Sequence, residues 1–335
     1  MTCRIVLSSL SLIGVVAASA ACGGAELRLA VPTRDELTLR VPGADGEGQA
    51  LRLGETSRLY EGTAQIARTI NGGVGTVFAL SEQIMALPPT DTDGETYAVW
   101  GPSEPRGLER HSFRFTVNRV APGQFDYRLD ARLKDAVAEE DFVAIWEGTS
   151  FPADEGRGHG TLALHWGALR SLDGDPCAVG EVAVDYAADV EPRRIDVRFV
   201  EVVDGCADER PTTASYHYEE NADESGLMDY AFKKNLHDVA EDKPLEEVFA
   251  VRSRWLADGQ GRADVRLSEG EIETDLATHL PDSGATTADV VECWDASFQV
   301  VFVDTTPAEL EPVLGFSEEG DVSACAFAEA SFSAL

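Results

Sequence analysis

Hydrophobic and polar residues alternate with a period of two over most of the chain from about Tyr97 onward. Such alternation places successive side chains on opposite faces of a β-sheet. Residues 113–117 and 125–133 follow this pattern on either side of the turn Ala121-Pro122-Gly123, which predicts a hairpin. Because Gly, Pro and Asp separate the later segments, we expect an antiparallel meander. Its further strands are predicted at residues 142–146, 161–166, 182–186, 195–203, 214–218, 228–232, 248–255, 263–267 and 298–303, with a final strand in 325–335.

The region before Tyr97 is patterned differently. Residues 26–31 and 37–41 alternate briefly and predict two short strands. Residues 55–87 then carry an apolar stripe with spacings of three, four and once seven, which predicts one long helix ending at Pro88-Pro89. The stripe consists of Leu59, Ile66, Ile70, Val74, Val77, Leu80, Ile84 and Leu87.

Three glycines, Gly72, Gly73 and Gly75, lie at the centre of this helix. Each costs about 1 kcal/mol relative to alanine inside a helix. One interpretation is a helix that covers the core and bends or breaks at the glycines. The other is a lid whose glycine hinge opens a cavity.

The fold class predicted is mainly β (α+β), with a large curved antiparallel sheet or open half-barrel meander and one long N-terminal helix packed on it. In outline this is similar to the half-barrel of bacterial lipoprotein carriers, a likeness of architecture without a shared motif. The apolar face of the sheet is expected to carry Phe113, Phe115, Phe125, Tyr127, Trp166, Tyr186 and Phe199. Residues 26–335 are expected to form a single domain.

The first 21 residues predict an export signal. Arg4 is followed by an uncharged run of 17 residues, 5–21, that ends in small side chains. A membrane-spanning helix needs about 20 apolar residues, and no charge cluster follows to stop transfer. We therefore expect residues 1–21 to be a cleaved signal peptide.

Ser19-Ala20-Ala21-Cys22 resembles the lipobox of bacterial lipoproteins. The resemblance implies cleavage before Cys22, lipid on that cysteine and a short tether, residues 22–25. Ser19 departs from the pattern, in which leucine is usual, and ordinary cleavage after Ala20 is the alternative. Gly23 stands where aspartate marks inner-membrane retention in enterobacterial lipoproteins, so the resemblance points to the outer membrane.

The cysteine count favours lipidation. Cleavage removes Cys3, and lipid on Cys22 leaves an even set of four cysteines that can pair in an oxidising compartment. The hairpin predicted around residues 188–192 brings Cys177 and Cys206 together, which leaves Cys293 for Cys325. A thiolate metal site is the alternative, although the chain has no C-x-x-C pair.

Composition limits the partners. The chain has 27 Lys and Arg against 60 Asp and Glu, a formal charge of −33. Such a surface repels nucleic acid, and we expect no nucleic-acid partner. The membrane is a partner only through the N-terminal lipid.

No catalytic motif is present, and we predict no catalytic residue, metal or cofactor. His159 and His165 share one face of a predicted strand, and we expect both to face solvent. Asp91-Thr92-Asp93-Gly94-Glu95 has the composition of a turn and lacks the full spacing of a calcium loop.

Three functions are compatible with these patterns. A structural or interaction lipoprotein of the cell envelope is favoured. The first alternative is a carrier or sensor that holds an apolar ligand, such as a lipid, between sheet and helix. The second is a hydrolase whose site is assembled from scattered residues. Candidates for lining the ligand cavity are Val74, Val77, Phe113, Phe115, Phe125, Tyr127 and Trp166.

Overall fold

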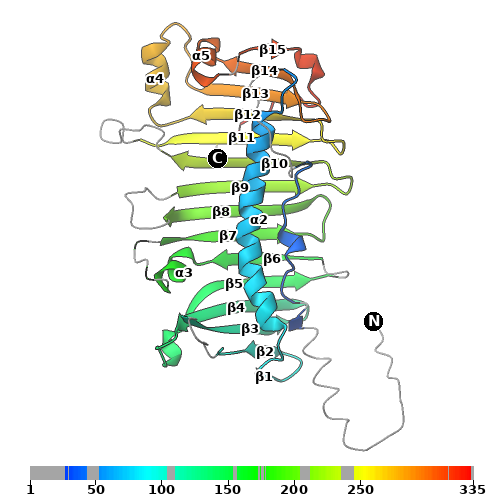
Figure 1. Cartoon of the computed structure of the whole chain (residues 1–335), viewed down its shortest axis with the longest axis vertical. Helices are drawn as coiled ribbons and strands as arrows, with labels where there is room; N and C mark the ends of the chain where they lie inside the picture. The colour runs from blue at the N-terminus through cyan, green and yellow to red at the C-terminus, as the bar shows by residue number, and fades with distance from the viewer. Residues whose placement is uncertain are drawn as a thin grey trace, which may run out of the picture.

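The computed structural model describes residues 27–28, 30–43, 53–103, 110–153, 157–172, 174, 177, 179–203, 212–234, 245–315 and 317–332, with the side chains of 76, 77, 169, 212, 234, 313 and 314 left aside. Within these ranges the chain is mainly β, and fifteen antiparallel strands form one open sheet in which each strand pairs with the next in sequence (Figure 1). The strands are β1 Asp91–Thr92, β2 Tyr97–Trp100, β3 His111–Ala121, β4 Gln124–Leu133, β5 Val143–Pro152, β6 Gly158–Leu164, β7 Val179–Ala187, β8 Arg193–Val203, β9 Thr212–Glu220, β10 Gly226–Lys234, β11 Glu247–Trp255, β12 Gly261–Ser268, β13 Ala288–Trp294, β14 Val300–Thr306 and β15 Glu319–Gly320.

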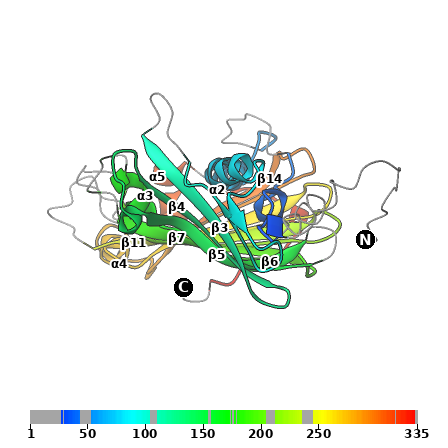
Figure 2. The same cartoon turned by 90° about the horizontal axis from the view of Figure 1, so that it is seen from below.

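The helices of the described ranges are few. They are η1 Asp35–Leu37, α2 Arg58–Met85, η2 Glu139–Asp141, α3 Trp166–Leu172, α4 Ile272–His279, η4 Ala308–Leu310, α5 Glu311–Leu314 and η5 Val322–Ala324. Only α2 crosses the sheet, and it lies on one face, which we call the inner face (Figure 2).

Local sequence explains why α2 begins and ends where it does. The Ser57 hydroxyl accepts a hydrogen bond from the backbone N–H of Tyr60 at 3.1 Å and caps the first turn. At the other end, Pro88-Pro89 cannot continue a helix. The helix has 28 residues and is about 42 Å long, close to the roughly 43 Å that nine strand spacings cover. Consequently α2 runs across the strands from β13 to about β4 (Figure 1).

Two predictions about this helix need correction. It was expected as the N-terminal element, whereas segment 30–43 and η1 precede it on the same face. One interpretation also allowed a break at its glycines, whereas one helix continues from Arg58 to Met85. A Cβ at Gly72 or Gly73 would meet no atom within 4 Å, so the solvent side of the helix accommodates them.

The segment 30–43, which we call the N-terminal segment, lies beside α2 and runs in the opposite direction (Figure 1). The side-chain amide of Asn71 on α2 donates to the Leu39 carbonyl and accepts from the Leu39 N–H, both at 2.8 Å. The Tyr218 hydroxyl of β9 bonds both backbone groups of Arg40 at 2.9 Å. The strands predicted at 26–31 and 37–41 are therefore wrong for the described residues, because side chains and not a neighbouring strand satisfy this backbone.

The register separates two chemically different faces. The inner face carries rows of apolar side chains, such as Tyr186, Ile195, Tyr218 and Met228 on β7–β10, all at most 5% exposed. On the outer face, the alternate positions of the same strands are mostly polar. A one-residue slip in any strand would exchange the two sets, so the hydrophobic pattern determines the register.

Several strand boundaries differ from expectation. β1, β2, β13 and β15 were not predicted, and Trp166 begins α3 instead of ending a strand. No strand forms in residues 325–332, the described part of the predicted final strand. The C-terminal residues instead lie across the outer face of β11–β13.

Candidate functional site: an apolar groove beside α2

One row of apolar residues crosses the inner face without interruption from β2 to β13. Its members are opposite one another in consecutive strand pairs, so all point to the same face. We call it the apolar row. It consists of Trp100, Phe115, Leu129, Trp146, Leu164, Val182, Phe199, Ala214, Phe232, Phe249, Leu267 and Ala288.

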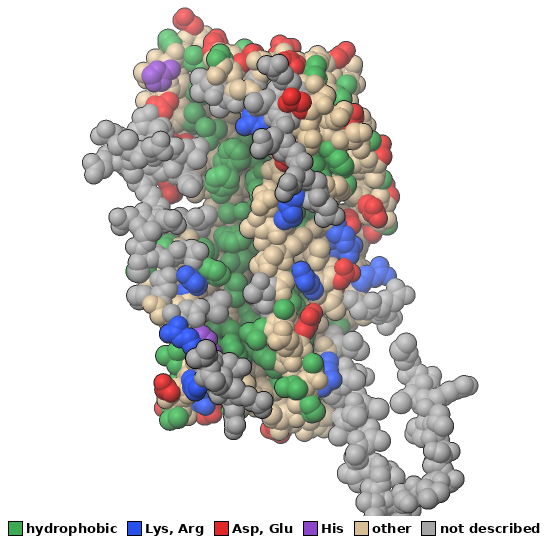
Figure 3. Space-filling view, in the orientation of Figure 1, with side chains coloured by type: hydrophobic (Ala, Val, Ile, Leu, Met, Phe, Trp, Pro, Cys, Tyr) green, Lys and Arg blue, Asp and Glu red, His purple; other side chains and the backbone are tan. Residues whose placement is uncertain are grey.

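Coverage of this row changes along the sheet. From β2 to β5 its members are at most 1% exposed, because the C-terminal half of α2 and neighbouring side chains cover them. From β6 to β12 six of its seven members are only half-buried. These six form what we call the groove floor: Leu164, Val182, Phe199, Phe232, Phe249 and Leu267. Figure 3 shows the result as a continuous hydrophobic strip beside the helix.

The flank of α2 that borders this strip is also apolar. Residues in a helix are about 100° apart, so the flank opposite Asn71 and Gly75 carries Leu59, Ile66, Leu80 and Ile84. All four are half-buried. The N-terminal segment occupies the Asn71 side of the helix, whereas no described element covers the side with these four residues (Figures 1 and 3). Together the groove floor and this flank define the apolar groove.

The interface directly beneath α2 is filled. Phe78 of the helix lies 5.7 Å, ring to ring, from Trp146, which in turn contacts Phe115 at 5.4 Å and Tyr127 at 5.2 Å. Ala64 and Ala67 on the buried stripe are each 2% exposed and allow close approach of helix and sheet. The helix is thus held by ordinary core packing.

The cavity candidates from the sequence fall into different places. Phe115, Phe125 and Tyr127 are at most 5% exposed and belong to the packed core under the helix. Val74 and Phe113 are half-buried and pack against that core. Trp166 lies on α3, beside the sheet, and the Val77 side chain is outside the described residues. Of the groove floor, the sequence singled out only Phe199, which was assigned to the apolar face. Alternation places the other five residues on that face too, but it does not show which residues the helix leaves uncovered.

The groove floor contains no charged side chain, and the tyrosines next to it are neutral. Burial raises the pKa of Tyr216 and of Tyr230, so both phenols keep their protons at neutral pH. Their rings stack at 5.9 Å, and Tyr216 contacts Phe199 at 5.6 Å. The surface therefore suits a ligand without charge along its length.

One carboxyl group is buried where α2 begins. Glu292 of β13 is 2% exposed; its carboxylate accepts from the Ser57 hydroxyl at 2.6 Å and from the Leu59 N–H at 2.9 Å. Desolvation raises its pKa, partly offset by these two hydrogen bonds and by nearby Arg58. Glu292 thus secures the start of the helix to the sheet.

On the outer face of the sheet, oppositely charged side chains form pairs. His217 Nδ1 lies 2.7 Å from the Asp196 carboxylate, which accepts its hydrogen bond, and Arg252 forms an ion pair with Asp229. The depression around them is lined by these pairs, by the Asp185–Arg198 ion pair and by Ser215. Within each of these pairs, the two opposite charges offset one another.

The two histidines singled out from the sequence pair with carboxylates. His159 lies 2.8 Å from Asp189, and His165 lies 3.3 Å from Glu147 and 3.2 Å from Glu181. His159 is 48% exposed and His165 only 28%, so the latter is partly shielded. Among the described residues, no group of three or more His, Cys, Asp or Glu is arranged to hold a metal.

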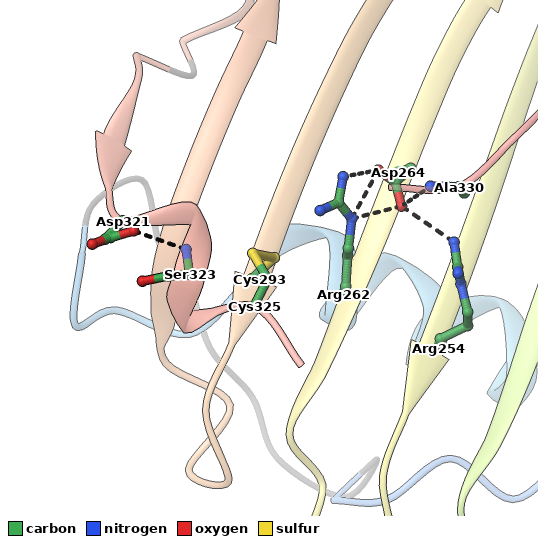
Figure 4. Close-up of a disulfide and its surroundings, with 8 residues drawn as sticks. All are labelled: Arg254, Arg262, Asp264, Cys293, Asp321, Ser323, Cys325 and Ala330. Atoms are coloured by element: carbon green, nitrogen blue, oxygen red, sulfur yellow. Dashed lines mark hydrogen bonds and ion pairs between the residues drawn. A yellow bond between two sulfur atoms is a disulfide. The ribbon is translucent and has the colours of Figure 1, made fainter. Parts of the chain in front are cut away.

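A disulfide attaches the C-terminal residues to the outer face. Cys293 of β13 is bonded to Cys325, which confirms the predicted pair (Figure 4). Beyond it, the Ala330 N–H donates to the buried Asp264 carboxylate at 3.3 Å, and Phe332 covers Arg266 at 4.6 Å. Cys177 is disulfide-bonded too, but Cys206 lies outside the described residues, so that pairing stays a prediction.

Comparison of the chain with protein-family models, curated proteins and solved structures finds no match. No described helix is both long enough and apolar enough to span a membrane. The groove must therefore be interpreted from its own geometry.

Proposed function

We propose that this chain is an exported lipoprotein, anchored through Cys22, that holds an apolar ligand in the groove beside α2. The observation that carries the proposal is the coincidence of two apolar surfaces: the half-buried groove floor on β6–β12 and the open flank of the helix. Soluble proteins seldom leave a long continuous apolar strip exposed unless it binds something.

This proposal differs from the structural role that the sequence favours. A lipoprotein that assembles by joining sheets needs long exposed edge strands. Here β1 and β15, the outermost strands of the described sheet, have two residues each. Such short edge strands disfavour association between sheets. We therefore prefer the groove to the sheet edges as the functional site.

The proposal also places the ligand beside the helix, whereas the sequence led us to expect it between sheet and helix. The space between sheet and helix is occupied by Phe78, Trp146 and their neighbours, so binding there would require separating packed aromatic rings. A ligand beside the helix displaces no core side chain. No hinge at the glycines is then required.

The test compares two adjacent residues of β8 that point to opposite faces. Phe199 is in the groove floor, and Val200 is 49% exposed on the other face. Binding of a fluorescent fatty acid to purified protein is expected to fall about tenfold in Phe199→Asn and to stay unchanged in Val200→Asn. Equal binding by both variants, or none by the wild type, contradicts the proposal.

The anchor is tested separately. Cys22→Ala should remove the acyl mass from the N-terminus and move the protein from the membrane fraction to the soluble fraction. Membrane association that survives the substitution, with no acyl mass in the wild type, contradicts lipidation.

A further inference from the structure

We infer that the occupant of the groove is an acyl chain of a lipid from the same membrane that anchors the protein, entering at the β6 end and extending toward β12. This inference rests on the proposed function and adds the class of ligand and the direction of loading.

The first argument is where the chain emerges from the anchor. Arg28 donates to the Leu87 carbonyl at 2.8 Å, and the Ser150 hydroxyl of β5 donates to the Ala30 carbonyl. Trp100 of β2 also donates to Leu87, at 3.0 Å. The start of the described chain is therefore attached to the β2–β5 end of the sheet.

The second argument is the length of the tether. Leu27 follows Cys22 by five residues, which span at most about 18 Å when fully extended. The β5 end of the sheet is thus held close to the membrane surface. By contrast, β12 is seven strand spacings farther along, about 34 Å from β5. A groove that runs across the strands then has one end near the membrane and one end far from it.

The third argument is the length of the groove. From β6 to β12 it covers six strand spacings, about 29 Å. The hydrocarbon of one membrane leaflet is about 15 Å deep, half of the bilayer core. An extended acyl chain therefore fits along the groove floor without leaving it.

The fourth argument is that the groove floor offers no hydrogen-bonding groups to a ligand. Strands β6–β12 each pair on both sides, so the backbone of the floor is committed to neighbouring strands and cannot add a peptide strand. The apolar row offers no polar side chain between Leu164 and Leu267. A hydrocarbon chain needs no hydrogen bonds and matches this lining better than a peptide.

The experiment uses the lipidated full-length protein on phosphatidylcholine vesicles that contain radiolabelled phosphatidylcholine. A photo-crosslinking phenylalanine analogue replaces Leu164 near the membrane end, Phe199 two strand spacings (about 10 Å) farther along the groove, or Val200 on the outer face. We expect crosslinks to lipid at Leu164 and at Phe199, and none at Val200. Shortening the acyl chains should reduce crosslinking at Phe199 and leave that at Leu164 unchanged.

A charge placed midway tests the direction. With Val182→Asp, between the two probes, crosslinking at Phe199 should fall about tenfold and crosslinking at Leu164 should persist, which also shows that the variant is folded. Val200→Asp adds the same charge on the outer face and should change neither signal. Undiminished crosslinking at Phe199 in Val182→Asp overturns entry from the β6 end.

Failure of this inference can be told from failure of the proposed function. If the protein binds a fluorescent fatty acid in solution but neither groove position crosslinks to vesicle lipid, the groove stands and the membrane lipid is excluded as its occupant. If fatty-acid binding is absent as well, the proposed function fails with it. Crosslinks to a copurifying protein in place of lipid would also overturn the inference that an acyl chain occupies the groove.

Discussion

The two flanks of α2 belong to one amphipathic helix but form chemically different surfaces. On one flank, Asn71 bonds both backbone groups of Leu39, and a Cβ at Gly75 would lie 2.8 Å from the Arg34 guanidinium. On the other flank, Leu59, Ile66, Leu80 and Ile84 border an open groove. A polar residue and a small one on the first flank receive the N-terminal segment, whereas the second has only hydrocarbon and no covering element among the described residues.

The largest effect should separate covered from open positions of the apolar row. Trp146→Ala removes a side chain that is 1% exposed and contacts three aromatic rings, and should lower the free energy of unfolding by about 3–5 kcal/mol. Phe199→Ala, at a half-buried position, should lower it by about 1 kcal/mol. Urea denaturation measures both. Equal losses would mean that the groove is as tightly packed as the core.

The next effect tests the flank that holds the N-terminal segment. Asn71→Ala removes two hydrogen bonds to Leu39 and should cost about 2 kcal/mol. The exposed Gln65→Ala on the same helix is the control and should be near neutral. Hydrogen exchange at Leu39 should accelerate only in the first variant. Unchanged exchange there would show that the segment is held by other contacts.

The glycines give a smaller and opposite effect. Gly73→Ala has open space around the new methyl group and should stabilise the helix by about 1 kcal/mol. Gly75→Ala should gain less, because its methyl group must displace Arg34. Thermal unfolding compares the two. If Gly72→Ala, on the solvent side of the helix, weakens fatty-acid binding, the helix acts as a hinged lid after all.

The smallest effect is a dependence on pH at the start of the helix, where both flanks begin. The pKa of Glu292 is raised above 4.5 in the folded state, so the folded protein binds this proton more tightly than the unfolded chain. The resulting stability is complete below pH 4.5 and is lost as the pH rises through the raised pKa. Glu292→Gln should remove this part of the slope. The difference between wild type and variant across pH 4–7 is the measurement, and identical slopes would show that Glu292 titrates normally.

Several features were predictable because they depend on local chemistry. Period-two alternation identified most strands of the meander, and Pro88-Pro89 with the apolar stripe located α2 to within three residues at each end. Hairpin symmetry and elimination gave Cys293 the partner that it has. The strand predicted at 37–41 was wrong. An alternating apolar sequence looks the same whether a neighbouring strand or an asparagine side chain forms the hydrogen bonds of its backbone.

The candidate site was the least predictable part. Phe115 and Phe199 belong to the same row and have similar neighbours in sequence, yet one is fully buried and the other lines the groove. That difference depends on how the helix lies across strands that are far apart in the chain. The sequence by itself determined which residues share the inner face, because side chains alternate strictly along a strand. Only the tertiary structure decided which of them the described elements leave uncovered, because α2 and the N-terminal segment together occupy just part of that face.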